Sequence, residues 1–195
     1  MQKKLEILKK LNEEMIACSK CALRSNCNQV VPGNGSSEAQ ILFIGEAPGK
    51  KEDELGVPFV GSAGKFLDEM LASIKLKRED VYIANVCKCR PPNNRDPLPE
   101  EIETCWPWLE KQIQTINPKV IVTLGRHSLG RFVPNIKISE AHGRVFRREM
   151  PKIGKRYFYA LYHPAAALYN GSMRETLLND FKKIPKVLEK IKKEA

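Results

Sequence analysis

The chain has 195 residues, 42% of them apolar, so it can bury a core and we expect one domain over residues 1–195 rather than disorder. Its 33 lysines and arginines against 23 acids give a net charge of +10, which favours a polyanionic partner such as nucleic acid, although a well-solvated basic surface would give the same count. No apolar run is long enough to span a membrane and the N-terminus lacks a secretory signal, so we expect an intracellular protein, in the cytoplasm of a prokaryote.

The predicted elements alternate between strands and helices. Leucines at positions 5, 8 and 11, with Met15, recur at helical spacing within the first 15 residues and predict an amphipathic helix. Four short apolar runs predict strands, at residues 41–44, 81–86, 120–124 and 157–162. Helical patterns at 62–74 and 99–116 lie between strands, and Pro107 is expected to split the second helix at Trp106. This alternation predicts an α/β protein with a mostly parallel sheet.

The last third of the chain departs from that alternation. Residues 143–150 and 157–162 flank a segment with proline and glycine, so we expect them to form a hairpin. Residues 174–193 predict a basic amphipathic helix that Pro185 interrupts. The chain has no internal repeat and no linker, in keeping with one domain.

Three polar side chains follow three different predicted strands. Glu46 follows the first in a loop bounded by glycine and proline, Asn85 ends the second, and His163 follows the fourth. Singly, they would more often be a solvated carboxylate, a structural amide and a satisfied histidine. Ligands of α/β proteins bind beyond the carboxyl ends of parallel strands, so their common placement predicts one functional site.

Six cysteines in a reducing compartment indicate a metal before they indicate disulfides. They stand at positions 18, 21, 27, 87, 89 and 105. Cys18 and Cys21 form a CxxC pair before the first strand, outside the βαβ context of a redox motif. The remaining cysteines are scattered, which suits four thiolates that join distant segments. Spacing leaves an iron–sulfur cluster and a zinc ion both open.

Taken in order, these pieces resemble the family 4 (iron–sulfur) uracil-DNA glycosylases. The matching stretches are Cys18-x-x-Cys21, Gly45-Glu46-Ala47-Pro48-Gly49-x-x-Glu52-Asp53, Gly56-x-Pro58-Phe59-Val60-Gly61, Asn85-Val86-x-Lys88-Cys89-Arg90-Pro91-Pro92, Cys105 and His163-Pro164-Ala165. The ordered set covers almost the whole chain and is far more specific than any one motif. The resemblance implies a three-layer α/β/α sandwich around a four-stranded, mostly parallel sheet, and an enzyme that removes uracil without cutting the DNA backbone.

The resemblance also implies roles for the site residues. Glu46 would position or activate the attacking water and stabilise positive charge on the sugar, while His163 would bind O2 of the departing base. The residues implied to bind substrate are Gly45, Ala47, Glu52, Phe59, Asn85 and His163. Among them, Phe59 would stack on the flipped base, Asn85 would read its edge, and Glu52 would guard the space beside C5. A carboxylate and a histidine donor match the charges that develop when the bond breaks.

The same resemblance implies a structural [4Fe–4S] cluster on Cys18, Cys21, Cys89 and Cys105, with Cys27 and Cys87 outside the pattern. The implied partner is uracil-containing DNA, single- or double-stranded, and a sliding clamp is a further candidate partner. We expect a monomer. Leu168 or a neighbouring residue is the candidate side chain that fills the gap left in the base stack when uracil is flipped out. Residues 93–98 contain no histidine, which excludes the branch that traps DNA covalently. The competing hypothesis is a non-catalytic nucleic-acid-binding protein with a structural metal, which gives the strand-end residues no role.

Overall fold

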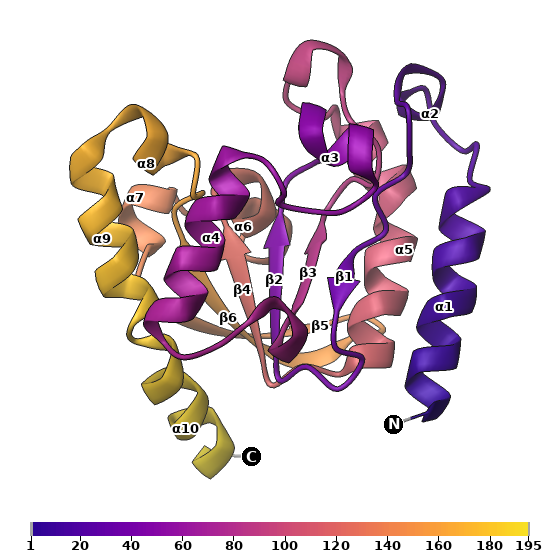
Figure 1. Cartoon of the computed structure of the whole chain (residues 1–195). Helices are drawn as coiled ribbons and strands as arrows, with labels where there is room; N and C mark the ends of the chain where they lie inside the picture. The colour runs from indigo at the N-terminus through magenta and orange to yellow at the C-terminus, as the bar shows by residue number, and fades with distance from the viewer. Residues whose placement is uncertain (1, 195) are drawn as a thin grey trace.

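The computed structural model describes residues 2–194, which form one sheet with helices on both of its faces (Figure 1). The strands are β1 Asn34–Gly35, β2 Ile41–Gly45, β3 Tyr82–Asn85, β4 Val120–Leu124, β5 Val145–Met150 and β6 Gly154–Leu161. The longer helices are α1 Gln2–Ile16, α4 Ser62–Ser73, α5 Pro99–Ile116, α9 Gly171–Phe181 and α10 Ile184–Glu194. Shorter ones are α2 Leu23–Asn26, α3 Lys50–Leu55, α6 Arg126–Phe132, α7 Ile138–Ala141 and α8 Ala166–Tyr169, with 3₁₀ turns η1 Arg78–Asp80 and η2 Pro92–Asn94.

The sheet contains the four predicted parallel strands and two more. Its order is β1-β3-β2-β4-β6-β5, and the four inner strands run parallel. The predicted count of four is wrong because β1 pairs antiparallel with β3 at one edge and β5 pairs antiparallel with β6 at the other. The two-residue β1 is too short to give a pattern, and β5 is mostly exposed, so neither has an apolar run. The hairpin that we predicted from the turn is confirmed as β5–β6.

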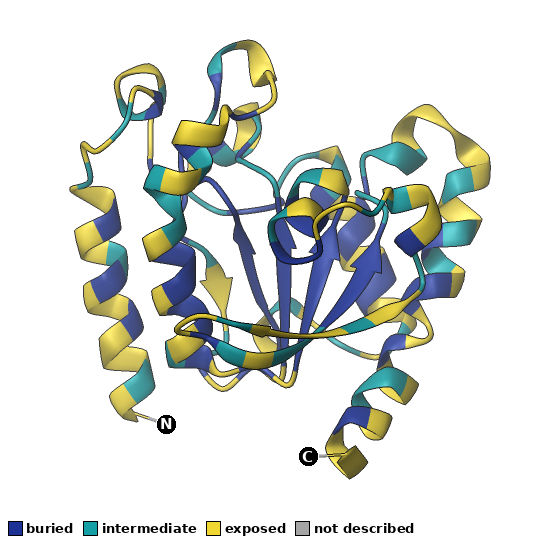
Figure 2. Cartoon of the chain, turned by 180° about the vertical axis from the view of Figure 1, so that it is seen from behind, coloured by how far each residue is buried: buried dark blue, intermediate teal, exposed yellow. Residues whose placement is uncertain are grey.

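Two separate cores, one on each face of the sheet, confirm the three-layer sandwich. On one face, apolar side chains of α1, α5 and α6 pack against the strands. On the other face, the core is built with side chains of α4, α9 and α10. Strands β2, β3 and β4 are buried along their whole length, as their dark colour in Figure 2 shows, and for β2 and β4 burial on both faces explains the continuously apolar sequences.

Two details of the helices differ from the sequence prediction. Helix α5 runs without a break through Pro107, so the predicted split at Trp106 is wrong. Side chains on both sides of that proline, among them Ile102 and Ile113, pack on the same core, and this packing outweighs the lost backbone hydrogen bond. The tail is indeed interrupted, but at residues 182–183, and Pro185 lies in the first turn of α10, where proline is tolerated. Within residues 2–194, no helix combines the length and the apolar character needed to cross a membrane.

The connectivity creates a crevice at the carboxyl end of β2. The chain passes from β2 to its neighbour β3 on one side and then to β4 on the opposite side of β2. Connections that leave in opposite directions open a crevice at the strand ends, where α/β proteins bind ligands. In this register Gly45 pairs with Asn85, so the residues that follow β2 lie directly beside the end of β3.

Candidate active site

A cavity of about 520 Å³ lies in this crevice. Its lining residues are Glu46, Ala47, Pro48, Gly49, Glu52, Phe59, Ala63, Asn85, Pro91, Asn94, Arg95, Asp96, His163, Ala165 and Tyr169. Of the residues predicted to act on the substrate, the structure brings all but Gly45 to the cavity wall. Gly45 lies immediately behind it, against two of the lining side chains.

Asn85 carries an acceptor without a partner. The residue is 2% exposed, and its Oδ1 accepts no hydrogen bond from the described residues. A buried amide oxygen in that state costs free energy unless a ligand supplies a donor. The buried Lys88 fixes the end of β3, because its Nζ donates to the backbone oxygen of Asn85 at 2.8 Å and to Gln112 Oε1 at 2.7 Å. The unpaired acceptor is therefore held in place beside the cavity.

Phe59 has an unusual backbone conformation. Its φ is +54°, in the left-handed region, which costs a residue with a Cβ about 1–2 kcal/mol. Two glycines allow its position: a Cβ on Gly45 would lie 2.6 Å from the ring atom Cζ, and a Cβ on Gly64 would lie 1.7 Å from the Phe59 backbone oxygen. Strain held at a ligand pocket is a common mark of a functional position.

Glu52 is fixed by the loop that carries Phe59. Its Oε1 accepts hydrogen bonds from the backbone N–H groups of Val60 and Gly61, both at 2.8 Å. The carboxylate also lines the cavity, so its orientation is set before any ligand enters. Glu52 thereby joins α3 to the segment that leads into α4.

His163 is arranged as a neutral donor. Its Nδ1 accepts a hydrogen bond from the backbone N–H of Ala165 at 3.1 Å, which leaves the proton on Nε2. Burial lowers the pKa of His163 to about 4, although Glu52 opposes the shift, so the ring is uncharged at neutral pH. Gly125 makes room for it, since a Cβ there would lie 3.1 Å from His163 Cβ. The imidazole lies against Phe59, with ring centres 5.6 Å apart.

Glu46 belongs to a charged group that the sequence analysis missed. Its Oε2 lies 3.6 Å from His127 Nε2, and the same nitrogen lies 3.2 Å from Asp96 Oδ1. Burial raises the pKa of Glu46 and Asp96 adds to the rise, while His127 and Arg126 oppose it. His127 follows the end of β4 by three residues, so its position in the sequence is a signal of the same kind as that of Glu46. Asp96 comes from the loop after β3 and has no such signal.

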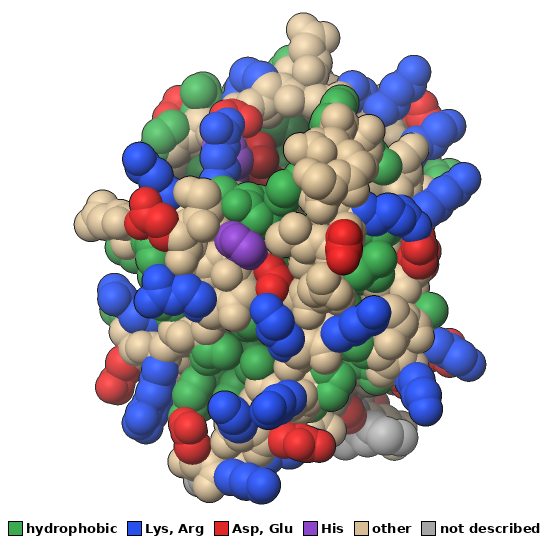
Figure 3. Space-filling view, turned by 90° about the vertical axis from the view of Figure 1, so that its left-hand side faces the viewer, with side chains coloured by type: hydrophobic (Ala, Val, Ile, Leu, Met, Phe, Trp, Pro, Cys, Tyr) green, Lys and Arg blue, Asp and Glu red, His purple; other side chains and the backbone are tan. Residues whose placement is uncertain are grey.

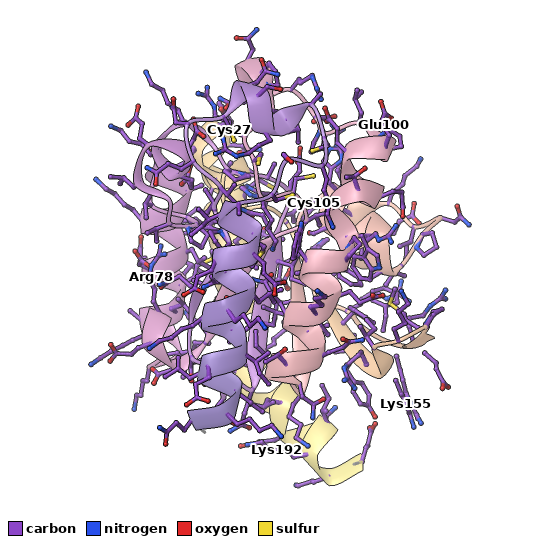
Figure 4. The ribbon with its side chains drawn as sticks, turned by 90° about the vertical axis from the view of Figure 1, so that its right-hand side faces the viewer. Cys27, Arg78, Glu100, Cys105, Lys155 and Lys192 are labelled. Atoms are coloured by element: carbon purple, nitrogen blue, oxygen red, sulfur yellow. The ribbon has the colours of Figure 1, made fainter. Side chains whose placement is uncertain are left out.

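The four cysteines expected to bind metal line a second pocket, between the N-terminal segment and α5. Cys27 directly follows α2, Cys105 lies near the first residues of α5, and other sulfur atoms lie between them in Figure 4. The backbone N–H of Lys88 donates to Cys105 Sγ at 3.2 Å. A hydrogen bond from Cys87 lowers the pKa of Cys105 to about 7, and Lys88 adds to this effect while burial opposes it. The lowered pKa favours the thiolate, which is the form that binds metals.

The spacing of these sulfur atoms differs from that of a single-ion site. Zinc bonds of about 2.3 Å would hold four thiolates within about 4 Å of one another. Among the residues that the structure describes, the one group of three or more possible ligands lying within 4.8 Å of one another is Glu46, Asp96 and His127. The cysteines share a pocket without forming so tight a group.

One face of the molecule is basic, and exposed apolar side chains lie on the short helix that follows His163. Lysine and arginine side chains are spread over the face that includes α9 and α10, with fewer acids between them (Figure 3). On α8, directly after His163, Leu168 is 50% exposed and Tyr169 is 90% exposed. Tyr169 lines the cavity, and Leu168, the predicted wedge, is its neighbour in the chain.

The sequence matches known proteins along most of its length. A family model described as the uracil DNA glycosylase superfamily matches residues 32–191. A type-4 uracil-DNA glycosylase of Archaeoglobus fulgidus is 50% identical over 187 residues, which cover 92% of each chain. A type-4 uracil-DNA glycosylase of Thermotoga maritima is 41% identical over 187 residues, covering 95% of this chain and 96% of the relative. A type-5 uracil-DNA glycosylase of Thermus thermophilus is 34% identical over 149 residues, covering 68% of each.

Proposed function

The chain belongs to the type-4 branch of the uracil-DNA glycosylase superfamily, and we propose that it releases uracil from DNA in the cavity described above. The reaction hydrolyses the N-glycosidic bond and leaves an abasic site, as base excision repair requires. The observation that carries the assignment of the cavity is the buried, unpartnered Oδ1 of Asn85. It is an acceptor fixed where a flipped base would present its edge.

Base selection would rest on Asn85 and the walls around it. The unpaired Oδ1 suits the N3–H of uracil, and the amide NH₂ of the same side chain can donate to O4. Cytosine presents an acceptor at N3 and a donor at C4, so it would leave the amide mispaired. The ring of Phe59 can stack on the extruded base, and Glu52 would exclude the C5 methyl group of thymine by occupying the space beside C5.

Bond cleavage would rest on Glu46 and His163, which line the same cavity. As the bond to N1 breaks, positive charge grows on the sugar and negative charge on the base. Glu46, once ionised, stabilises the sugar cation and orients a water molecule toward C1′. The Nε2–H of His163 donates to O2 of the departing uracil anion. A neutral imidazole suits this step because burial keeps the ring uncharged before the base leaves.

The cysteine pocket would hold the [4Fe–4S] cluster through Cys18, Cys21, Cys89 and Cys105, which line it. Four soft thiolates fit such a group, and a cluster is larger than one ion, in keeping with sulfur atoms that do not form the tight group a single ion needs. Its contribution would be to tie the N-terminal segment to the end of β3 and to α5. Lys88 lies between this pocket and Asn85, so the same tie would stabilise the uracil-reading strand end.

The experiment that tests the function uses anaerobically purified protein and an oligonucleotide with one uracil, offered as a single strand, opposite guanine and opposite adenine. We expect free uracil and an abasic site that alkali cleaves, and no product when cytosine or thymine replaces uracil. Glu46→Gln serves as the matched control, since it keeps the shape of the side chain and removes its charge. Failure of the wild-type protein to release uracil from all three substrates would refute the proposal.

The remaining expectations concern partners and location. The net charge of +10 and the basic face in Figure 3 support DNA as the partner. A monomeric state, an intracellular location and a sliding-clamp partner stay predictions. Gel filtration with light scattering, with and without a uracil-containing duplex, tests the first of them.

A further inference from the structure

Arg78 reaches the loop that carries Phe59 from a distant part of the chain. It lies in η1, just before β3, and its guanidinium donates to three backbone oxygens of the Phe59 region. Nη1 donates to Pro58 at 2.9 Å, and Nη2 donates to Phe59 and, at 3.5 Å, to Gly64. The remaining nitrogen, Nε, pairs with Asp68 of α4 at 2.5 Å.

These contacts fall on the residues that hold Phe59 in its left-handed conformation. The three carbonyls belong to the residue before Phe59, to Phe59 itself and to Gly64, whose lack of a Cβ allows the close approach. On the other side of the loop, Glu52 accepts hydrogen bonds from the next two backbone N–H groups. The strained peptide is therefore held from both sides by ionised side chains, whose hydrogen bonds are stronger than those of neutral groups.

We propose that Arg78 is a positioning residue for uracil recognition, which holds Phe59 in the backbone conformation that presents its ring to the flipped base. The inference rests on the proposed function, because it assigns a role within the same cavity. Arg78 does not line that cavity, so it acts through Phe59. It also lies well away from the labelled cysteines in Figure 4, so changes at Arg78 should leave the metal pocket intact.

Arginine suits this role better than lysine. A guanidinium has five N–H donors in a fixed planar fork, and four of the contacts above use that fork at once. A lysine ammonium is a compact charge that cannot reach three carbonyls and a carboxylate together. Arg78→Lys should therefore keep the charge and lose most of the positioning.

The test is a double-mutant cycle between Arg78 and Phe59, read by single-turnover release of uracil. Base–aromatic stacking typically contributes about tenfold or more in affinity, so we expect Arg78→Met and Arg78→Lys to slow release by roughly tenfold. In a Phe59→Ala background, Arg78→Met should change the rate by less than about twofold, since no ring remains to be positioned. Inhibition by free uracil should weaken in the same pattern, while binding to abasic DNA stays near the wild-type level.

Two control variants separate this role from a structural one. Lys77→Met removes a positive charge one residue away on an exposed side chain and should leave the rate unchanged. Asp68→Asn breaks the ion pair and spares the contacts to the carbonyls, so its rate should also stay within about twofold of wild type. Melting temperature and iron content are measured for every variant, so that loss of fold or cluster is recognised.

Several results would overturn the inference. It fails if Arg78→Met slows release equally in the Phe59→Ala background, if Asp68→Asn causes the same loss, or if Phe59→Ala by itself has no effect. If Arg78→Met does not fold, the cycle is run with Arg78→Lys and judged in the same way. A wild-type protein that releases no uracil would instead refute the proposed function, so the two failures are distinguishable.

Discussion

We expect Gly45→Ala to slow the release of uracil by about 100-fold while leaving the protein folded. The added Cβ would lie 2.4 Å from Asn85 Oδ1 and 2.6 Å from Phe59 Cζ, whereas ordinary contacts begin at 3.4 Å. The amide or the ring must therefore move by about 1 Å, and a misplacement of that size can cost about 100-fold in rate. The overpacking should cost about 1–3 kcal/mol of stability, which a folded domain tolerates.

The assay is single-turnover release of uracil with enzyme in excess, alongside thermal unfolding and binding to abasic DNA. Gly130→Ala is the matched control, because Gly130 lies within α6 and an added Cβ there meets no atom within 4 Å. That variant should keep the wild-type rate and gain up to about 1 kcal/mol of stability, since alanine is the better helix former. A Gly45→Ala protein with the wild-type rate would show that Asn85 and Phe59 need not hold these positions, and the account of the cavity would be wrong.

Three further predictions concern the catalytic and metal-binding side chains. Glu46→Gln should slow base release by on the order of 100-fold in single-turnover kinetics and leave the affinity for uracil-containing DNA almost unchanged; a parallel loss of binding would contradict a role confined to the transition state. Because burial raises the pKa of Glu46 and the ionised carboxylate is the active form, the rate of base release should rise with pH through a midpoint above 4.5. His163, with a pKa of about 4, should add no step to the pH profile near 6.5. A step near 6.5 that His163→Gln removes would contradict the neutral state of the ring. Cys105→Ser should lose iron and the brown colour and unfold at a lower temperature, whereas Cys27→Ser should keep both; equal iron in the two variants, measured by elemental analysis, would contradict the proposed ligands.

The local patterns of the sequence were sufficient for most of the fold. The buried strands β2 and β4 are continuously apolar because both of their faces are covered, and that pattern can be recognised without a structure. Where prediction failed, tertiary packing decided the outcome. Helix α5 continues through Pro107 because its side chains before and after the proline pack on the core. Strand β1 exists only through its pairing with β3 at the edge of the sheet.

The candidate site divides in the same way. Glu46, Asn85 and His163 could be predicted because polar residues at the ends of parallel strands meet at one edge of a sheet, and strand ends can be read from the sequence. His127, Asp96 and Arg78 could not be assigned roles by that reasoning, since their contacts are made across segments that the sequence does not show to be neighbours. Arg78 stands 19 residues from Phe59, and its importance depends on where its guanidinium lies.

The sequence by itself determined the candidates for the catalytic and metal-binding side chains, the segments that form the inner strands and the likeness to one family. Only the tertiary structure decided their states: the unpaired oxygen of Asn85, the proton on Nε2 of His163 and the left-handed backbone of Phe59. The physical reason is that hydrogen bonding, burial and close approach depend on distances between residues far apart in the chain. A pattern of residue types fixes the candidates for such contacts, and packing selects which of them form.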